Sequence, residues 1–185
     1  MNHDEVAVSD RVELPTDPSD SLADVLARAP YKRIDHIALA VRDLESAIHL
    51  FEKVLGFELK ERRQIRGART GMVSAEMEAN GMRFVLCQGT EPQSQVSKLI
   101  ENFGVGVAHI ALEVDDVEDT VDTLRARGMR FDTNVIRGPG LTQSFTTRCD
   151  NTGLSFELIR RDGEDGFLEG NVQALFDQLE QDDKY

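Results

Sequence analysis

The chain has 185 residues, of which 40% are hydrophobic, and its formal net charge is −13. This length and composition predict a globular domain with enough apolar residues to form a core. The charge excludes a general nucleic-acid binder, because such proteins neutralise phosphates with clusters of Lys and Arg that no stretch here supplies. The longest apolar runs are strand-sized and the start of the chain is acidic, so we expect neither a membrane segment nor a secretory signal.

The two cysteines, Cys87 and Cys149, show neither a disulfide framework nor the spacing of a metal site. We interpret both as small apolar residues and expect a cytoplasmic protein.

An acidic tail and a short helix are predicted for the segment 1–32. The stretch 1–20 is acidic and lacks apolar periodicity. Ser21 is a suitable N-cap for a helix through Ala29, which Pro30 would end.

Two strand-like heptapeptides, each with histidine as its second residue, organise the rest of the chain. They are Asp35-His-Ile-Ala-Leu-Ala-Val41 and Ala108-His-Ile-Ala-Leu-Glu-Val114. The spacing from His36 to His109 equals the spacing from Asp43 to Asp116, and each of these aspartates precedes a helix-like run. An internal repeat of this length predicts two tandem modules.

The first module, residues 33–88, reads as one strand, one helix and three strands. Its predicted elements are the strand 34–41, the helix 44–55 ended by Gly56, and the strands 57–63, 70–78 and 83–87. The helix would bury Ala47, Ile48, Phe51 and Leu55 on one face.

The second module, residues 106–160, repeats this order after a connecting helix over 96–103. Its predicted elements are the strand 107–114, the helix 117–127 ended by Gly128, and the strands 130–135, 143–148 and 153–160. In the remaining segment, 161–185, Asn171 could cap a helix with one apolar face that closes over the domain as a lid.

This paired βαβββ pattern over residues 33–160 resembles the vicinal oxygen chelate superfamily. The resemblance implies an α+β fold in which two modules form one metal-holding cup, with ligands on the first and last strands of each module. A carboxylate, Glu157, stands on the last strand of module two, whereas Val85 holds the corresponding place in module one. The expected ligands are therefore His36, His109 and Glu157, although a histidine in a buried strand is by itself more often a hydrogen-bonded core residue.

Two histidines and one carboxylate with open positions opposite them are typical of non-haem Fe(II) oxygenases. Two further stretches, 62–74 and 152–180, resemble the metal-binding C-terminal half of the 4-hydroxyphenylpyruvate dioxygenase family. This resemblance implies an Fe(II)-dependent oxygenase that acts on a small 2-oxo acid and O₂, and a homodimer is compatible with it. The residues that match the family's substrate-side or lid positions are Ser74, Gln95, Gln143, Phe167 and Asn171.

Three positions depart from that family's pocket, and they favour a different substrate. Cys87 stands in place of an Asn, Ala108 in place of a Gln and Val172 in place of a Phe. Two alternatives stay open: a non-redox epimerase, isomerase or lyase that uses Co, Zn, Ni or Mn, like methylmalonyl-CoA epimerase or glyoxalase, and a small-molecule binding protein. The epimerase alternative needs a catalytic base, for which Glu76 or Glu78 is the candidate.

Overall fold

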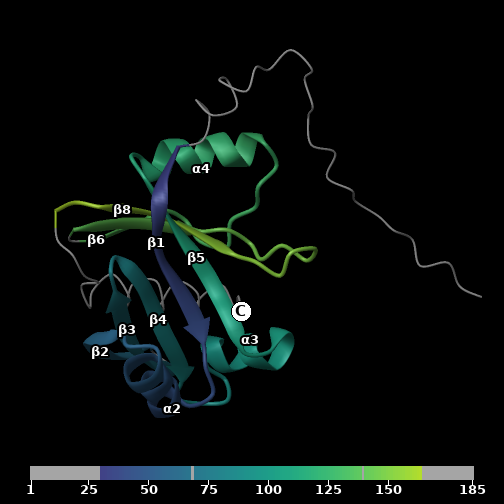
Figure 1. Cartoon of the computed structure of the whole chain (residues 1–185). Coiled ribbons are helices and arrows are strands. Elements are labelled where there is room, and N and C mark those ends of the chain that lie inside the picture. The colour runs from purple at the N-terminus through teal and green to yellow at the C-terminus, as the bar shows by residue number, and fades with distance from the viewer. Residues whose placement is uncertain (1–29, 68, 139, 164–185) are drawn as a thin grey trace, which may run out of the picture.

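The chain folds as one curled, mixed sheet of eight strands with few helices (Figure 1). The structure, a computed structural model, describes residues 30–67, 69–138 and 140–163. The first half comprises β1 (Tyr31–Ala40), α2 (Leu44–His49), the π-helical turn η1 (Leu50–Val54), β2 (Glu58–Arg66), β3 (Gly71–Ala79) and β4 (Met82–Gly89). After α3 (Gln95–Phe103), the second half comprises β5 (Gly106–Val114), α4 (Val117–Ala126), β6 (Ile136–Gly138), β7 (Leu141–Phe145) and β8 (Phe156–Arg161).

This order confirms the predicted α+β class and the repeated strand, helix and three-strand pattern. The predicted N-terminal helix and C-terminal lid helix lie outside the described residues. None of the described helices is long and apolar enough to cross a membrane.

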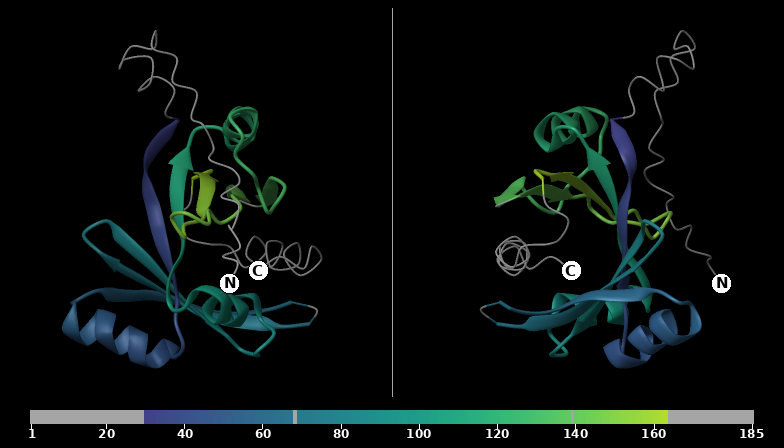
Figure 2. Two further views of the ribbon diagram at one scale, coloured as in Figure 1. Left: turned by 90° about the vertical axis from the view of Figure 1, so that its right-hand side faces the viewer. Right: turned by 60° about the vertical axis from the view of Figure 1, so that its left-hand side comes forward.

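The two histidine-bearing strands lie side by side at the centre of the sheet, whose strand order is β2-β3-β4-β1-β5-β8-β7-β6. β1 pairs antiparallel with β5, and each pairs in parallel with the last strand of its own half, β4 or β8. Figure 2 shows β1 and β5 running together between the two halves. The topology therefore brings the first and last strands of both halves to one place.

The first helix of each half begins at an aspartate that satisfies a free backbone N–H. The Asp43 carboxylate accepts a hydrogen bond from the Ser46 amide, and the Asp116 carboxylate accepts one from the Asp119 amide. The repeat thus extends to the N-caps, which fix where α2 and α4 start.

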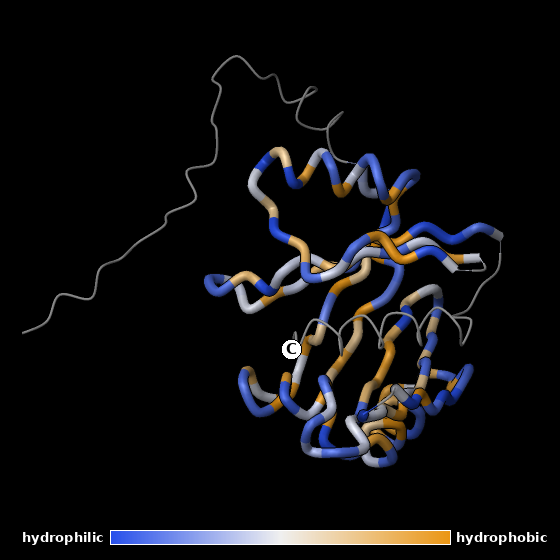
Figure 3. The backbone as a smooth tube through the Cα atoms, turned by 180° about the vertical axis from the view of Figure 1, so that it is seen from behind, coloured by the Kyte–Doolittle hydropathy of each residue, from blue (hydrophilic) through white to orange (hydrophobic). Residues whose placement is uncertain are grey.

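Each half buries an apolar cluster between its helix and one side of its strands. In the first half Phe51 packs with Met77 and Leu86, and in the second Val121 packs with Leu158. The alternation of hydrophobic and hydrophilic residues along α4 is visible in Figure 3, as expected for a helix with one buried face. Because successive strand residues point to opposite sides, the other side of the strands is left to carry the polar residues of the cup.

Two details of the predicted elements are wrong. The helix continues past His49 as a π-helical turn, whose wider ring leaves Leu55 55% exposed instead of on the buried face. The segment 130–135 forms only an isolated bridge at Phe131, and the short strand β6 begins at Ile136.

Candidate metal centre

Three side chains from three adjacent strands converge on one point. His36 comes from β1, His109 from β5 and Glu157 from β8. The Nε2 atoms of the two histidines are 3.3 Å apart. The Oε2 atom of Glu157 lies 3.3 Å from Nε2 of His36 and 3.2 Å from Nε2 of His109. The structure thus brings together all three of the residues predicted as ligands.

The arrangement fits a divalent metal ion. A single ion can reach three atoms separated by 3.2–3.3 Å at the usual bond lengths of about 2.0–2.2 Å for imidazole nitrogen and carboxylate oxygen. The Oε1 atom of Glu157 is buried and has no hydrogen-bond partner among the described residues. A buried carboxylate oxygen without a partner is costly, and a bound cation would compensate for it.

The charges of the three groups are set by one another. Burial tends to raise the pKa of Glu157, but hydrogen bonds from His109 and His36 outweigh it and hold the pKa at about 2. Burial tends to lower the pKa of His36, whereas hydrogen bonds to Asp35 and Glu157 raise it to about 8. Burial lowers the pKa of His109. Glu157 is therefore held as an anion, and each histidine must present an unprotonated Nε2 atom to a bound metal ion.

Asp35 fixes which nitrogen of His36 faces the other two groups. Its Oδ1 atom lies 2.8 Å from Nδ1 of His36, so Nδ1 donates to the carboxylate and Nε2 points toward His109 and Glu157. Arg161 in turn donates two hydrogen bonds of 2.7 Å to the Asp35 carboxylate. Burial tends to raise the pKa of Asp35, but the hydrogen bonds from Arg161 and His36 bring it well below its usual range.

Val85 occupies the place in the first half that Glu157 occupies in the second. Ala38 of β1 pairs with Val85 of β4. Its repeat counterpart, Ala111 of β5, pairs with Glu157 of β8. The register therefore agrees with the position inferred from the repeat, and an apolar side chain stands where a fourth ligand would be.

A pocket opens directly beside the three convergent groups. Among the described residues it is lined by His36, Arg63, Met72, Ser74, Val85, Cys87, His109, Gln143, Phe145 and Glu157. The Phe145 ring packs edge-on against the His109 ring, with centroids 5.1 Å apart. A largely apolar wall with a few polar groups is the usual composition of a small-molecule site.

The predicted substrate-side residues fall into three groups. Ser74 and Gln143 line the pocket. Gln95 is the first residue of α3 and is not among the described residues of the pocket wall. Phe167 and Asn171 lie outside the described residues.

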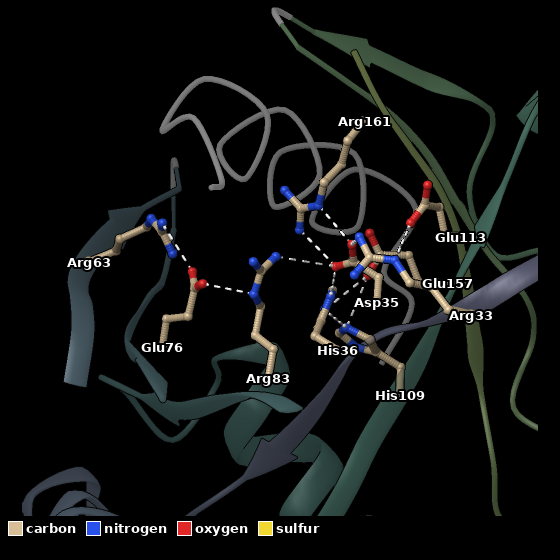
Figure 4. Close-up of polar contacts among 10 residues, drawn as sticks. All are labelled: Arg33, Asp35, His36, Arg63, Glu76, Arg83, His109, Glu113, Glu157 and Arg161. Carbon is tan, nitrogen blue, oxygen red and sulfur yellow. Dashed lines mark hydrogen bonds and ion pairs between the residues drawn. The ribbon is translucent and has the colours of Figure 1, made fainter. Parts of the chain in front are cut away.

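A row of buried charges next to the pocket was missed from the sequence (Figure 4). Glu76 lies between two arginines, 3.5 Å from Nη2 of Arg63 and 3.1 Å from Nε of Arg83. Arg83 also approaches Asp35, at 3.9 Å. Their positions on strands were predictable, but their burial was not, because Arg and Glu are rarely buried unless they are paired.

Comparison with known proteins agrees with this fold. Residues 33–158 match the family model described as the Glyoxalase/Bleomycin resistance protein/Dioxygenase superfamily. The chain is 31% identical to 4-hydroxyphenylpyruvate dioxygenase of Pseudomonas aeruginosa, over 80% of its own length and 52% of that protein. It thus spans about half the length of this relative.

Two further proteins extend the comparison. A probable lactoylglutathione lyase of Vibrio cholerae is 31% identical, over 75% of this chain and 97% of that protein. The solved structure of a mutant 4-hydroxymandelate synthase from Streptomyces coelicolor superposes with a TM-score of 0.71 at 24% identity, over 84% of this chain and 55% of that one. With the family model matching most of its length, the chain belongs to the glyoxalase, bleomycin resistance protein and dioxygenase superfamily.

Proposed function

We propose that the chain is a non-haem Fe(II)-dependent oxygenase that acts on a small 2-oxo acid. The observation that carries this proposal is the set of three convergent groups, His36, His109 and Glu157, with Val85 in the place of a fourth. Two histidines and one carboxylate leave several coordination positions open, as the binding of both substrate and O₂ requires. When bound, Fe(II) would supply the activation of O₂ beside the chelated substrate.

The chain's own residues would hold the metal, orient the substrate and exclude water. His36, His109 and Glu157 would be the ligands. The hydroxyl of Ser74 and the amide of Gln143 would hydrogen-bond the substrate, since both line the same pocket. The remaining wall is mostly apolar, which lowers the local dielectric constant and keeps competing water away.

The state of Glu76 favours an oxygenase over an epimerase. The epimerase alternative needs a carboxylate free to take a proton from the substrate. Glu76 is 5% exposed and is held between Arg63 and Arg83. Neither Glu76 nor Glu78, the other candidate, is among the described residues of the pocket wall. The proposed oxygenase reaction requires no general base.

The substrate class rests on the dioxygenase relative and on the resemblance in the sequence. The resemblance implies a 2-oxo acid, and Cys87 and Ala108 stand where that family has polar pocket residues. Fewer hydrogen-bonding groups in the wall favour a side chain less polar than a hydroxyphenyl ring. A homodimer remains a prediction, which sedimentation equilibrium at several protein concentrations would test.

Oxygen uptake after anaerobic reconstitution tests the proposal. The protein is loaded with Fe(II) and mixed with a panel of aromatic and aliphatic 2-oxo acids in an oxygen electrode. We expect uptake that requires iron, depends on one acid, and disappears in Glu157→Gln, which removes the charged ligand with little change in volume. The matched control is Glu118→Gln on α4, which neutralises the ion-pair partner of Arg137 and should retain the activity of the unmodified protein. Metal binding without uptake on any acid would contradict the proposal.

A non-redox metal-dependent lyase is the second candidate. It is favoured by the match to the probable lactoylglutathione lyase, of which the chain covers 97%. This candidate predicts that the protein forms or breaks down lactoylglutathione. The reaction should need a divalent metal and consume no O₂. Measuring that reaction with Zn²⁺, Ni²⁺ and Co²⁺ beside the oxygen assay separates the two candidates.

A further inference from the structure

Asp35 and His36 are consecutive residues of a strand, yet both side chains are buried. Successive strand residues normally point to opposite sides of a sheet. Here Asp35 is 3% and His36 2% exposed, and the pairing of β1 with β5 is irregular between Ile34 and His36. Such an irregularity changes the direction of neighbouring side chains, and it allows both residues to face inward.

The Asp35 carboxylate connects the two halves of the sheet. It accepts hydrogen bonds from His36 on its own strand and from Arg161 on β8. Arg161 lies on the same side of β8 as Glu157, four residues after it. One carboxylate therefore joins the strand of one candidate ligand to the strand of another, and Figure 4 shows it between the two partners.

The second histidine has no such carboxylate partner within the described part of the chain. The residue before His109 is Ala108, which is the repeat counterpart of Asp35. Among the described residues, His109 contacts the Phe145 ring and the other two convergent groups. Both histidines contact Glu157 through Nε2, but only His36 has a described carboxylate partner at Nδ1, whereas the His109 ring packs against Phe145.

We propose that Asp35 and Arg161 form a positioning pair that orients His36 and thereby sets the metal affinity of the centre. The hydrogen bond from Nδ1 to Asp35 leaves the lone pair of Nε2 for the metal and raises the basicity of the ring. The two parallel hydrogen bonds from Arg161 hold the carboxylate in the plane that this contact needs. The inference rests on the proposed metal centre, and it does not depend on which reaction the centre supports.

The two members of the pair have unequal effects. Replacing Asp35 by Asn puts an amide NH₂ group within reach of His36, which favours the tautomer with the proton on Nε2 and blocks the metal. Replacing Arg161 leaves the hydrogen bond between Asp35 and His36 in place, and Arg83 still lies 3.9 Å from the carboxylate. The Asp35 variant should therefore be affected more strongly.

The affinity for Co²⁺, an air-stable spectroscopic probe, tests this proposal in the full chain. We expect Asp35→Asn to bind Co²⁺ about 10–100-fold more weakly than the unmodified protein, with a changed visible spectrum. Arg161→Gln should lose less, and Glu118→Gln, which neutralises the ion-pair partner of the exposed Arg137, should lose nothing. At alkaline pH, where the His36 ring of the metal-free protein is neutral, its ¹⁵N spectrum should report a proton on Nδ1 in the unmodified protein and a proton on Nε2 in Asp35→Asn.

Wild-type affinity and an unchanged ring tautomer in Asp35→Asn would overturn the positioning role, whatever the enzyme catalyses. If circular dichroism shows that Asp35→Asn is unfolded, Arg161→Gln decides in the same way. Suppose that the variants bind Co²⁺ more weakly but the iron-loaded, unmodified protein consumes no oxygen with any acid. That result would support the positioning pair and overturn only the proposed oxygenase activity. If the unmodified protein binds no Co²⁺, both are overturned.

Discussion

Ser74 and Gln143 face the pocket from equivalent places in the two halves of the sheet. Ser74 pairs with Cys87, which lies two residues beyond Val85 on β4. Gln143 pairs with Ile159, which lies two residues beyond Glu157 on β8. The pseudo-symmetry that aligns the candidate ligands therefore also places two polar groups on opposite walls of the pocket.

This relationship predicts that Ser74→Ala and Gln143→Leu weaken substrate binding without weakening metal binding. Each removes about one hydrogen bond, worth about 0.5–1.5 kcal/mol, or roughly a 3–10-fold rise in KM. Gln95→Ala is the matched control and should leave KM unchanged, because Gln95 is absent from the described pocket wall. Steady-state oxygen uptake together with Co²⁺ titration measures both quantities. A larger rise in KM for Gln95→Ala than for the other two variants would show that the substrate binds against α3 and not between Ser74 and Gln143.

Val85→Glu should convert the centre to one with four protein ligands. The new carboxylate would stand at the repeat counterpart of Glu157 and occupy a position that we assign to substrate or O₂. We expect tighter Co²⁺ binding, a changed visible spectrum and a loss of oxygen uptake of at least about tenfold. Val85→Ala separates this effect from simple loss of the valine, since it enlarges the pocket without adding a ligand. Full uptake in Val85→Glu would mean that Val85 lies outside the coordination sphere.

The sequence alone was sufficient for the features that depend on the repeat. A constant offset relates the two histidines and the two capping aspartates. The same comparison showed that Val85 holds the position in the first half that corresponds to Glu157 in the second. Strand periodicity then predicted which residues share a face. The order of strand, helix and three strands in each half follows from these two regularities. The closed cup and the convergence of three groups were implied by the resemblance to the superfamily.

The features that depend on irregular backbone could not be predicted in this way. The irregular pairing beside Asp35 breaks the alternation on which face assignments rest. The burial of Arg63 depends on its ion pair with Glu76 on another strand. A local sequence pattern does not show which charged residues pair across strands. The π-helical turn after His49 similarly shifts the helical periodicity.

The π-helical turn makes a prediction about stability. Phe51 is 8% exposed and packs against the rings of Phe57 and Phe84, whereas Leu55 is 55% exposed. Phe51→Ala should lower the free energy of unfolding by about 3–5 kcal/mol, because it leaves a cavity. Leu55→Ala should change it by no more than about 0.5 kcal/mol. Urea unfolding followed by circular dichroism measures both changes. If Leu55→Ala lowers the free energy of unfolding as much as Phe51→Ala does, Leu55 is buried, as the regular helix predicted from the sequence requires.

The two cysteines should differ sharply in their reaction with iodoacetamide. Burial raises the pKa of Cys87 to about 12, which keeps its thiol protonated in the pocket wall at neutral pH. Cys149 is exposed, and hydrogen bonds from Thr152 lower the pKa of its thiol. Because the thiolate is the nucleophile, Cys149 should react at least about a hundredfold faster at pH 8.

The pH dependence follows from the same shifts. The rate at Cys149 should rise with pH and level off once its thiol is ionised, below the pH expected for an unperturbed cysteine. The rate at Cys87 should stay low up to pH 10 and increase only when the protein is unfolded in guanidinium chloride. Peptide mass spectrometry of timed samples measures the two sites separately. Rapid alkylation of Cys87 in the folded protein would show that the pocket opens to solvent far more widely than its buried wall indicates.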